Sequence, residues 1–217
     1  MIARKRTAVL ISGRGSNLQI LIDAAKDPAY PADIALVLSN VAGAQGLERA
    51  SAAGIPTQTI SHRGHPTRES FDAEIDKVLR AEKIDLVCLA GFMRVLSDDF
   101  VRCWEGRLIN IHPSLLPAFK GLHVHRQVLE AGVTLSGCSV HFVVPELDSG
   151  AIIAQAAVPV FAGDTEETLA ARTLEAEHRL YPLALKLLAS ASVKLEKGRA
   201  RFTAMPANTG TLFNPLG

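Results

Sequence analysis

The fold is decided by residues 7–26, which read TAVLISGRGSNLQILIDAAK. Residues 7–11 form a continuous apolar run, which is typical of a strand buried on both faces of a parallel sheet. A glycine-rich turn follows over 12–17, and residues 18–26 have the apolar spacing of an amphipathic helix. The alternation continues with a strand over 33–39, a helix over 44–53 and a short strand over 57–60. This β-α-β-α-β pattern predicts the first half of a doubly wound α/β fold.

The glycine-rich turn, SGRGSN, is a candidate anion site. The backbone N–H groups of Gly15, Ser16 and Asn17 would point at a phosphate at the start of the following helix, aided by the helix dipole. Leu18 stands where a dinucleotide-binding fingerprint has its third glycine, and the turn lacks the lysine of a P-loop. A tight turn with ordinary helix-capping residues explains the same sequence, so the turn alone leaves both interpretations open.

The rest of the chain continues the alternation of helices and strands. The pattern predicts helices over 68–83, 97–104, 122–131 and 165–188, the last interrupted near Tyr181 and Pro182. It predicts strands over 85–90, 108–112, 138–144 and 151–160, the last at a sheet edge because Pro159 cannot donate to a neighbour. A hairpin turning at Lys197 and Gly198 and a loose tail over 205–217 complete the chain. We expect a mostly parallel, twisted sheet with an antiparallel C-terminal portion.

Residues 107–121, which read RLINIHPSLLPAFKG, carry the candidate chemistry. Alternate residues of a strand share a face, so Asn110 and His112 project together. Pro113 should end the strand directly after them. The pair would therefore lie at the carboxyl end of a strand, where open α/β sheets bind ligands. From the residues alone, His112 could be a general acid or base, a metal ligand or a buried structural imidazole.

The glycine-rich turn over 146–150 offers a partner for His112. Its Asp148 could fold back toward the imidazole, stabilise the charged form and raise the pKa of His112. A charged imidazole beside the amide of Asn110 would stabilise an oxyanion, which suits acyl transfer through a tetrahedral intermediate. The sequence has no GxSxG motif and no cysteine with a clear base partner, so the attacking group would belong to a substrate.

Composition limits the function classes. The chain has 217 residues, 48% hydrophobic and 21% charged, which is a globular composition. A net charge of +1 gives no electrostatic case for binding nucleic acid or an anionic membrane. No apolar run approaches membrane-spanning length, and residues 8–11 are too short for the core of a signal peptide. The 3 cysteines lack CxxC spacing, which argues against disulfides and a structural zinc site and favours a cytoplasmic location.

Five segments resemble, in order, motifs of the folate-dependent formyltransferase family, most closely those of its phosphoribosylglycinamide formyltransferases. They are LISGRGSNLQ, LAGFMRVL, INIHPSLLPAFKG, VHFVVPELDSG and EAEHRLYP, and they extend from Leu10 to Pro182. The N-x-H…SLLP…D element is also shared with methionyl-tRNA formyltransferase and formyltetrahydrofolate deformylase. We expect neither the added basic domain of the first nor the regulatory domain of the second.

The resemblance implies a Rossmann-like formyltransferase fold and a reaction. A formyl group passes from 10-formyltetrahydrofolate, a co-substrate, to the amine of glycinamide ribonucleotide in purine biosynthesis, with no metal. The matched catalytic positions are Asn110, His112 and Asp148. The amine attacks directly, Asn110 and protonated His112 hold the oxyanion, and Asp148 keeps His112 charged.

Other matched positions bind the two substrates. Those of the ribonucleotide site are Gly15, Ser16, Asn17 and Glu177. Those of the folate site are Arg68, Met93, Arg94, Val95, Leu96 and Asn110, with Arg94 and Leu96 acting chiefly through their backbone. The resemblance implies one formyltransferase domain over 1–190, with a phosphate-binding half over 1–105 and a catalytic and folate-binding half over 106–190. A hairpin and tail follow over 191–217.

Three functions are compatible with these residues. The first is the formyltransferase, the second a deformylase that uses the same catalytic residues with water, and the third a non-catalytic nucleotide-binding module that uses only the glycine turn. For the first we expect two small-molecule substrates, no nucleic acid or membrane partner, and a monomer or homodimer.

Overall fold

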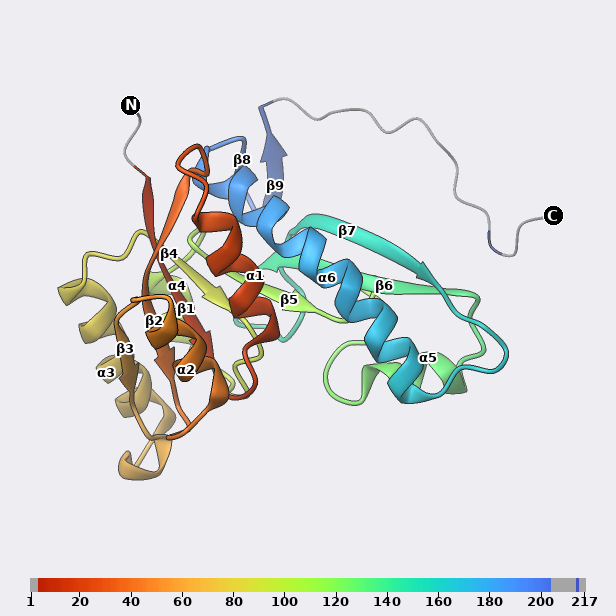
Figure 1. The fold of residues 1–217 in the computed structure, drawn as a ribbon, viewed down its shortest axis with the longest axis horizontal. Helices are drawn as coiled ribbons and strands as arrows, with labels where there is room; N and C mark the ends of the chain where they lie inside the picture. The colour runs from red at the N-terminus through yellow and green to blue at the C-terminus, as the bar shows by residue number, and fades with distance from the viewer. Residues whose placement is uncertain (1–3, 204–213, 215–217) are drawn as a thin grey trace.

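In the computed structural model, which describes residues 4–203 and 214, a seven-stranded sheet has the strand order β3-β2-β1-β4-β5-β6-β7 (Figure 1). The parallel strands are β3 (Thr57–Thr59), β2 (Ala32–Ser39), β1 (Lys5–Ile11), β4 (Leu86–Leu89) and β5 (Leu108–His112). Strands β6 (Leu135–Phe142) and β7 (Ile152–Pro159) are antiparallel, with β7 at the edge. This confirms the expected mostly parallel α/β sheet with an antiparallel C-terminal portion.

Helices cover both faces of the sheet (Figure 1). On one face lie α1 (Ser16–Ala25), α2 (Gln45–Ala52) and α6 (Glu166–Ala189); on the other lie α3 (Arg68–Ala81) and α4 (Asp98–Cys103). The apolar run of β1 divides between the two cores: Val9 and Ile11 pack under α1 and α6, whereas Ala8 and Leu10 pack under α3 and α4. Burial on both sides is why the central strands read as unbroken apolar runs.

Strand order reverses between β1 and β4, because the chain first builds outward to β3 and then returns to β4 on the other side of β1. Ligands of open α/β sheets bind at this switch point, outside the carboxyl ends of the strands. The glycine turn follows β1, and residues 91–97 follow β4. The fold therefore brings the two motifs to one edge of the sheet.

The predicted interruption of the last helix is wrong. Helix α6 runs through Pro182 for 24 residues. Tyr181 is fully buried, and its hydroxyl donates to the Leu89 carbonyl at 2.9 Å, while the Pro182 carbonyl accepts from Tyr30 at 2.7 Å. Packing on both sides of the proline holds the helix to the sheet, so the loss of one helical hydrogen bond does not end it.

The remaining elements are short. A 3-10 turn, η1 (His62–Gly64), precedes α3, and α5 (Val124–Glu130) packs with β7 and α6. The predicted hairpin is confirmed as β8 (Val193–Glu196) and β9 (Arg199–Phe202), with positive φ at both turn residues, Lys197 and Gly198. The predicted tail falls, apart from Asn214, outside the described residues.

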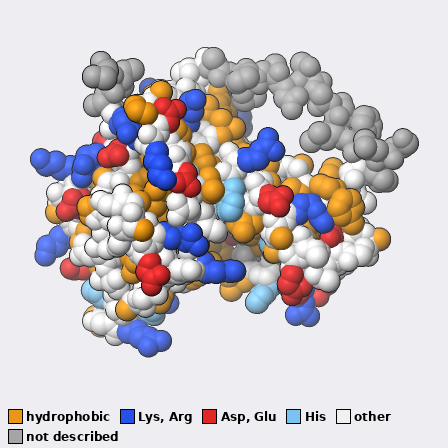
Figure 2. Space-filling view, viewed as in Figure 1, with side chains coloured by type: hydrophobic (Ala, Val, Ile, Leu, Met, Phe, Trp, Pro, Cys, Tyr) orange, Lys and Arg blue, Asp and Glu red, His pale blue; other side chains and the backbone are white. Residues whose placement is uncertain are grey.

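The surface is mixed in charge. Figure 2 shows acidic and basic side chains interspersed on the visible face, in keeping with the net charge of +1. No helix among residues 4–203 has the length and apolarity needed to span a bilayer.

Candidate active site

The glycine turn leaves the start of α1 open to an anion. Gly15 is the N-cap residue, with φ of 71°, and no side chain caps the helix. The Gly46 N–H donates to the Gly13 carbonyl at 3.0 Å, and a Cβ on Gly15 would lie 2.7 Å from the Gly46 Cα. Glycine is therefore required by close packing of α2 as well as by φ. Because neither Ser16 nor Asn17 caps the helix, the structure does not support the capping interpretation.

Glu177 of α6 reaches this turn from far along the chain. The Asn17 side-chain amide donates to Glu177 Oε2 at 2.7 Å, although 160 residues separate them. Glu177 is 7% exposed, and burial raises the pKa of its carboxyl to about 7, against a smaller lowering by Asn17. The Asn17 side-chain oxygen is buried without a hydrogen-bond partner among the described residues. The structure thus places a carboxylate and an amide beside the candidate phosphate turn.

The end of β5 presents the predicted pair on one face. Ile109 and Ile111 belong to the core under α6, so Asn110 and His112 point the other way. His112 Nδ1 lies 3.4 Å from Asp148 Oδ2, and both side chains are almost fully buried. The structure therefore brings together all three residues that the family motif marks as catalytic.

The turn that carries Asp148 is held against β6 and the segment after β5. Asp148 has φ of 49°, and its Oδ2 also accepts from the Gly121 N–H at 2.9 Å. Gly150 allows the close approach, because a Cβ there would lie 1.7 Å from the Phe142 carbonyl oxygen. The turn glycine is therefore what lets an acidic residue reach the imidazole.

Both nitrogens of His112 face acceptors. Nε2 lies 2.8 Å from the Phe119 carbonyl oxygen, which can only accept, so this nitrogen carries a hydrogen. Nδ1 faces the Asp148 carboxylate. The imidazole therefore lies between two hydrogen-bond acceptors, the Phe119 carbonyl oxygen and the Asp148 carboxylate.

His141 is a site residue that the sequence did not single out. Antiparallel pairing sets it opposite Asn110, and the Asn110 Nδ2 lies 3.4 Å from His141 Nε2. His141 Nδ1 donates to the Phe142 carbonyl at 2.9 Å, and burial lowers the pKa of His141, which keeps the ring neutral. Its Nε2 then accepts one amide hydrogen of Asn110, and the other amide hydrogen has no partner among the described residues. Its sequence signals were its place on the polar face of an alternating strand and its position within the family segment VHFVVPELDSG.

A hollow of about 110 Å³ opens beside these groups. It is lined by Leu89, Phe92, Arg94, Val95, Leu96, Val101, Asn110, His141, Val143, Val144, Pro145, Leu147 and Asp148. Two of the expected folate-site residues do not line it. The Met93 side chain is 68% exposed, and Arg68, at the start of α3, pairs with Glu69 at 3.6 Å.

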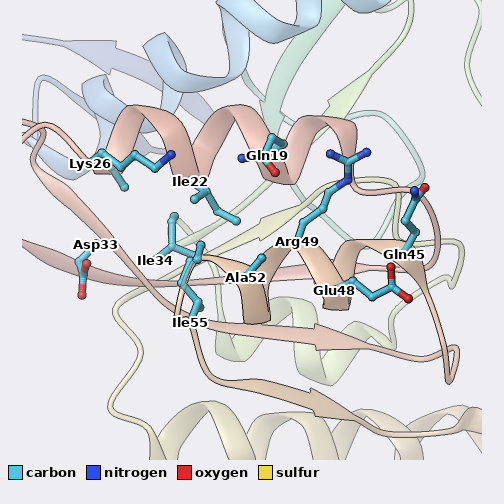
Figure 3. Close-up of a pocket in the computed structure, with 12 residues that line it drawn as sticks. Gln19, Ile22, Lys26, Asp33, Ile34, Gln45, Glu48, Arg49, Ala52 and Ile55 are labelled. Atoms are coloured by element: carbon cyan, nitrogen blue, oxygen red, sulfur yellow. The ribbon is translucent and has the colours of Figure 1, made fainter.

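A larger hollow, of about 630 Å³, lies away from this site. Figure 3 shows it between α1 and α2, with Ile22, Ile34 and Ile55 lining it and Lys26 and Arg49 among its charged groups. It contains none of the predicted site residues. We therefore assign the chemistry to the smaller hollow, where titratable groups and strand ends converge.

Comparison with known proteins shows which family the chain belongs to. Residues 5–185 match the family described as formyl transferase. The phosphoribosylglycinamide formyltransferase of Escherichia coli (strain K12) is 50% identical over 88% of this chain and 91% of its own length. The trifunctional purine biosynthetic proteins adenosine-3 of Drosophila pseudoobscura pseudoobscura and Bos taurus are 60% and 56% identical over 88% and 90% of this chain. The chain spans only 14% and 20% of the length of these two proteins.

Comparison with solved structures points to the same family. Glycinamide ribonucleotide transformylase 1 from Symbiobacterium toebii has a TM-score of 0.89 and 47% identity, covering 92% of this chain and 94% of that one. Phosphoribosylglycinamide formyltransferase from Brucella melitensis has a TM-score of 0.83 and 53% identity, covering 86% and 96%. The chain therefore belongs to the formyl transferase family and, within it, to the phosphoribosylglycinamide formyltransferases.

Proposed function

We propose that this chain transfers the formyl group of 10-formyltetrahydrofolate to the amine of glycinamide ribonucleotide, a step of purine biosynthesis. The observation that carries the proposal is the cluster of Asn110, His112 and Asp148 at the end of β5. The glycine turn and the hollow lie at the same edge of the sheet, so a substrate at each would lie near the other. The relatives named phosphoribosylglycinamide formyltransferase and glycinamide ribonucleotide transformylase support formyl transfer to this acceptor.

The acceptor site is proposed at the glycine turn. Gly15, Ser16 and Asn17 form the start of helix α1, which has no side-chain cap. Its first backbone N–H groups and the helix dipole would therefore favour binding of a phosphate. Glu177, beside Asn17, suits the ribose because a carboxylate accepts hydrogen bonds from hydroxyl groups. Together they would hold a sugar phosphate with its amine directed toward Asn110.

The donor site is proposed at the hollow beside β4. Its apolar walls suit a flat ring, and Arg94, Val95 and Leu96 form no hydrogen bonds with other described residues. Their free backbone groups suit a ring edge that carries both donors and acceptors. Direct roles for Arg68 and the Met93 side chain stay predictions.

The chain's own groups would act on the developing negative charge. As the amine nitrogen bonds to the formyl carbon, the carbonyl electrons move to the formyl oxygen. The free amide hydrogen of Asn110 and the charged His112 would stabilise that oxygen, and Asp148 would stabilise the charge on His112. Because His112 Nε2–H donates to Phe119, that carbonyl must give way for this hydrogen to reach substrate.

Collapse of the intermediate completes the transfer. The bond from the formyl carbon to the folate nitrogen breaks, and that nitrogen takes up the proton that the attacking amine loses. His112, with a hydrogen to give and a carboxylate to stabilise its charge, is the group we assign to this proton movement. Atoms and charge balance without any further reactant.

A formyl-transfer assay tests the proposal. The full chain is incubated with 10-formyltetrahydrofolate, with and without glycinamide ribonucleotide, and with methionyl-tRNA as an alternative acceptor. Formylated ribonucleotide should form, and tetrahydrofolate should be released only when the amine is present. Equal release without the amine would identify a deformylase instead.

Two variants test whether the chain is only a nucleotide-binding module. His112→Ala should lose transfer, whereas His65→Ala should keep it, because His65 packs edge-on against Phe71 and does not line the hollow. Full activity in His112→Ala would rule out the proposed catalysis. The division of residues 1–190 into two halves, a cytoplasmic location and a monomer or homodimer stay predictions.

A further inference from the structure

Residues 91–97 connect β4 to α4 and form one wall of the hollow. Two side chains from other elements hold this segment, one near each end. They are Ser12, directly after β1, and Asp72, in the second turn of α3. Neither belongs to a motif position that the resemblance assigns to substrate or catalysis.

Ser12 holds the first end with both its backbone and its side chain. The Ser12 N–H donates to the Gly91 carbonyl at 3.1 Å, and the Met93 N–H donates to Ser12 Oγ at 2.7 Å. The Ser12 hydroxyl hydrogen is used on Asn40 Oδ1, at 2.5 Å. Because a hydroxyl has one hydrogen, its bond to buried Asn40 fixes the oxygen lone pairs to receive Met93.

Asp72 holds the second end. Its Oδ2 accepts from the Ser97 N–H at 2.5 Å, and its Oδ1 has no hydrogen-bond partner among the described residues. Asp72 is 1% exposed, and burial raises the pKa of its carboxyl, partly offset by the Ser97 hydrogen bonds and the charge of Arg68. A buried carboxylate with an unsatisfied oxygen is costly, and the hydrogen bond from the Ser97 N–H offsets part of that cost.

The residues between the two fixed points are those with free backbone groups. Arg94, Val95 and Leu96 line the hollow, and no hydrogen bond within the described chain uses their N–H or C=O groups. A ligand gains affinity from such groups only if they are already held in place, because ordering them on binding would cost conformational entropy. The hydrogen bonds of Ser12 and Asp72 on either side hold these backbone groups in place before a ligand binds.

We propose that Ser12 and Asp72 are positioning residues for the formyl donor, holding residues 93–97 so that the backbone between them matches the donor ring. The inference rests on the proposed function, since it names the site that the two side chains organise. Ser12 also begins the glycine turn, so a residue of the turn proposed for the acceptor contacts the segment proposed for the donor.

Steady-state kinetics test the proposal. Ser12→Ala should raise the KM for 10-formyltetrahydrofolate about three- to tenfold, the effect of one neutral hydrogen bond. Asp72→Ala, which removes a charged acceptor, should raise it about ten- to a hundredfold. In both variants the KM for the ribonucleotide should change less than the KM for the donor. Asp72→Asn keeps an acceptor oxygen and should restore most of the donor affinity.

Matched controls separate positioning from general damage. Ser39→Ala removes a buried hydroxyl at the end of the neighbouring strand, whose bonds are to Val41 alone. Asp76→Asn alters a carboxylate one turn further along α3, which holds Trp104 of the segment after α4. Both should lower the melting temperature without a selective change in donor KM. A role of Asp72 only in joining α3 to α4 predicts the same result for Asp72→Ala, and that result would overturn the proposal.

Hydrogen exchange gives a measurement that does not depend on activity. Within residues 93–97 the amides protected by hydrogen bonds are those of Met93 and Ser97, and both should exchange faster in Asp72→Ala, whereas the amides of α4 should change less. Titration calorimetry with tetrahydrofolate measures donor-site binding directly. If the wild-type chain neither binds tetrahydrofolate nor transfers formyl, the proposed function fails. In that case hydrogen exchange still tests whether Ser12 and Asp72 order residues 93–97. Unchanged exchange over 93–97, or an equal rise in both KM values, overturns the proposal.

Discussion

Replacing Glu177 by glutamine should change how the free energy of unfolding depends on pH. Glu177 is 7% exposed, and burial raises the pKa of its carboxyl from its usual value of 4.5 to about 7. Between these values the unfolded chain has lost the proton that the folded chain still holds. The contribution of Glu177 to the free energy of unfolding is therefore fully present below pH 4.5 and falls as pH rises through 7.

The size of the effect follows from the two pKa values. Each unit of difference corresponds to about 1.4 kcal/mol, so the full loss is about 3 kcal/mol. Between about pH 5 and about pH 8 the expected change is roughly 2 to 3 kcal/mol. Glu177→Gln does not titrate, so the variant should gain this amount relative to the wild type over that range.

Urea unfolding at several pH values from 5 to 8 measures the difference. Subtracting the free energy of unfolding of the variant from that of the wild type at each pH cancels the contributions of the other titrating groups. Glu175→Gln is the matched control, because Glu175 is exposed on the same helix and should show little pH-dependent difference. Parallel stability curves for the wild type and Glu177→Gln would show that the carboxyl is not buried as described, and would refute the reasoning.

Three further variants test the site. Asn110→Ala should lower turnover about a hundred- to a thousandfold by removing one oxyanion donor, and steady-state rates near wild type would contradict that role. Asp148→Asn removes the carboxylate 3.4 Å from His112 Nδ1 and should lower turnover, because His112 loses the partner that orients it, and rates near wild type would contradict that role. Gly15→Ala places a side chain at φ of 71° and 2.7 Å from Gly46 Cα. It should cost at least about 1–2 kcal/mol in urea unfolding and raise the KM for the ribonucleotide, and unchanged values would contradict the packing argument.

The sequence predicted the local structure well because its signals are local. The apolar run of β1, the glycine turn and the helical spacing of α1 are all readable within one stretch of 20 residues. Alternation alone put Asn110 and His112 on one face of β5, and the hairpin turn at Lys197 and Gly198 followed from its residues. The family motifs suggested the reaction and the positions that we propose serve it.

The sequence could not supply distances or partners. Arg68 and Met93 match folate-site positions, yet the structure sets Arg68 beside Glu69 and turns the Met93 side chain toward solvent. Pro182 suggests a break that packing around Tyr181 overrides. The capping interpretation of Ser16 and Asn17 also fails, because the residue at the N-cap is Gly15.

What the sequence determined is which side chains leave each element and in what direction, since strand alternation and helical periodicity are properties of neighbouring residues. What only the tertiary structure decided is which of them meet. Glu177 reaches Asn17 across 160 residues, Asp148 reaches His112 through a turn, and His141 faces Asn110 because β6 pairs antiparallel with β5 in one register. Strand order and register arise from burial of whole faces, which no local pattern encodes.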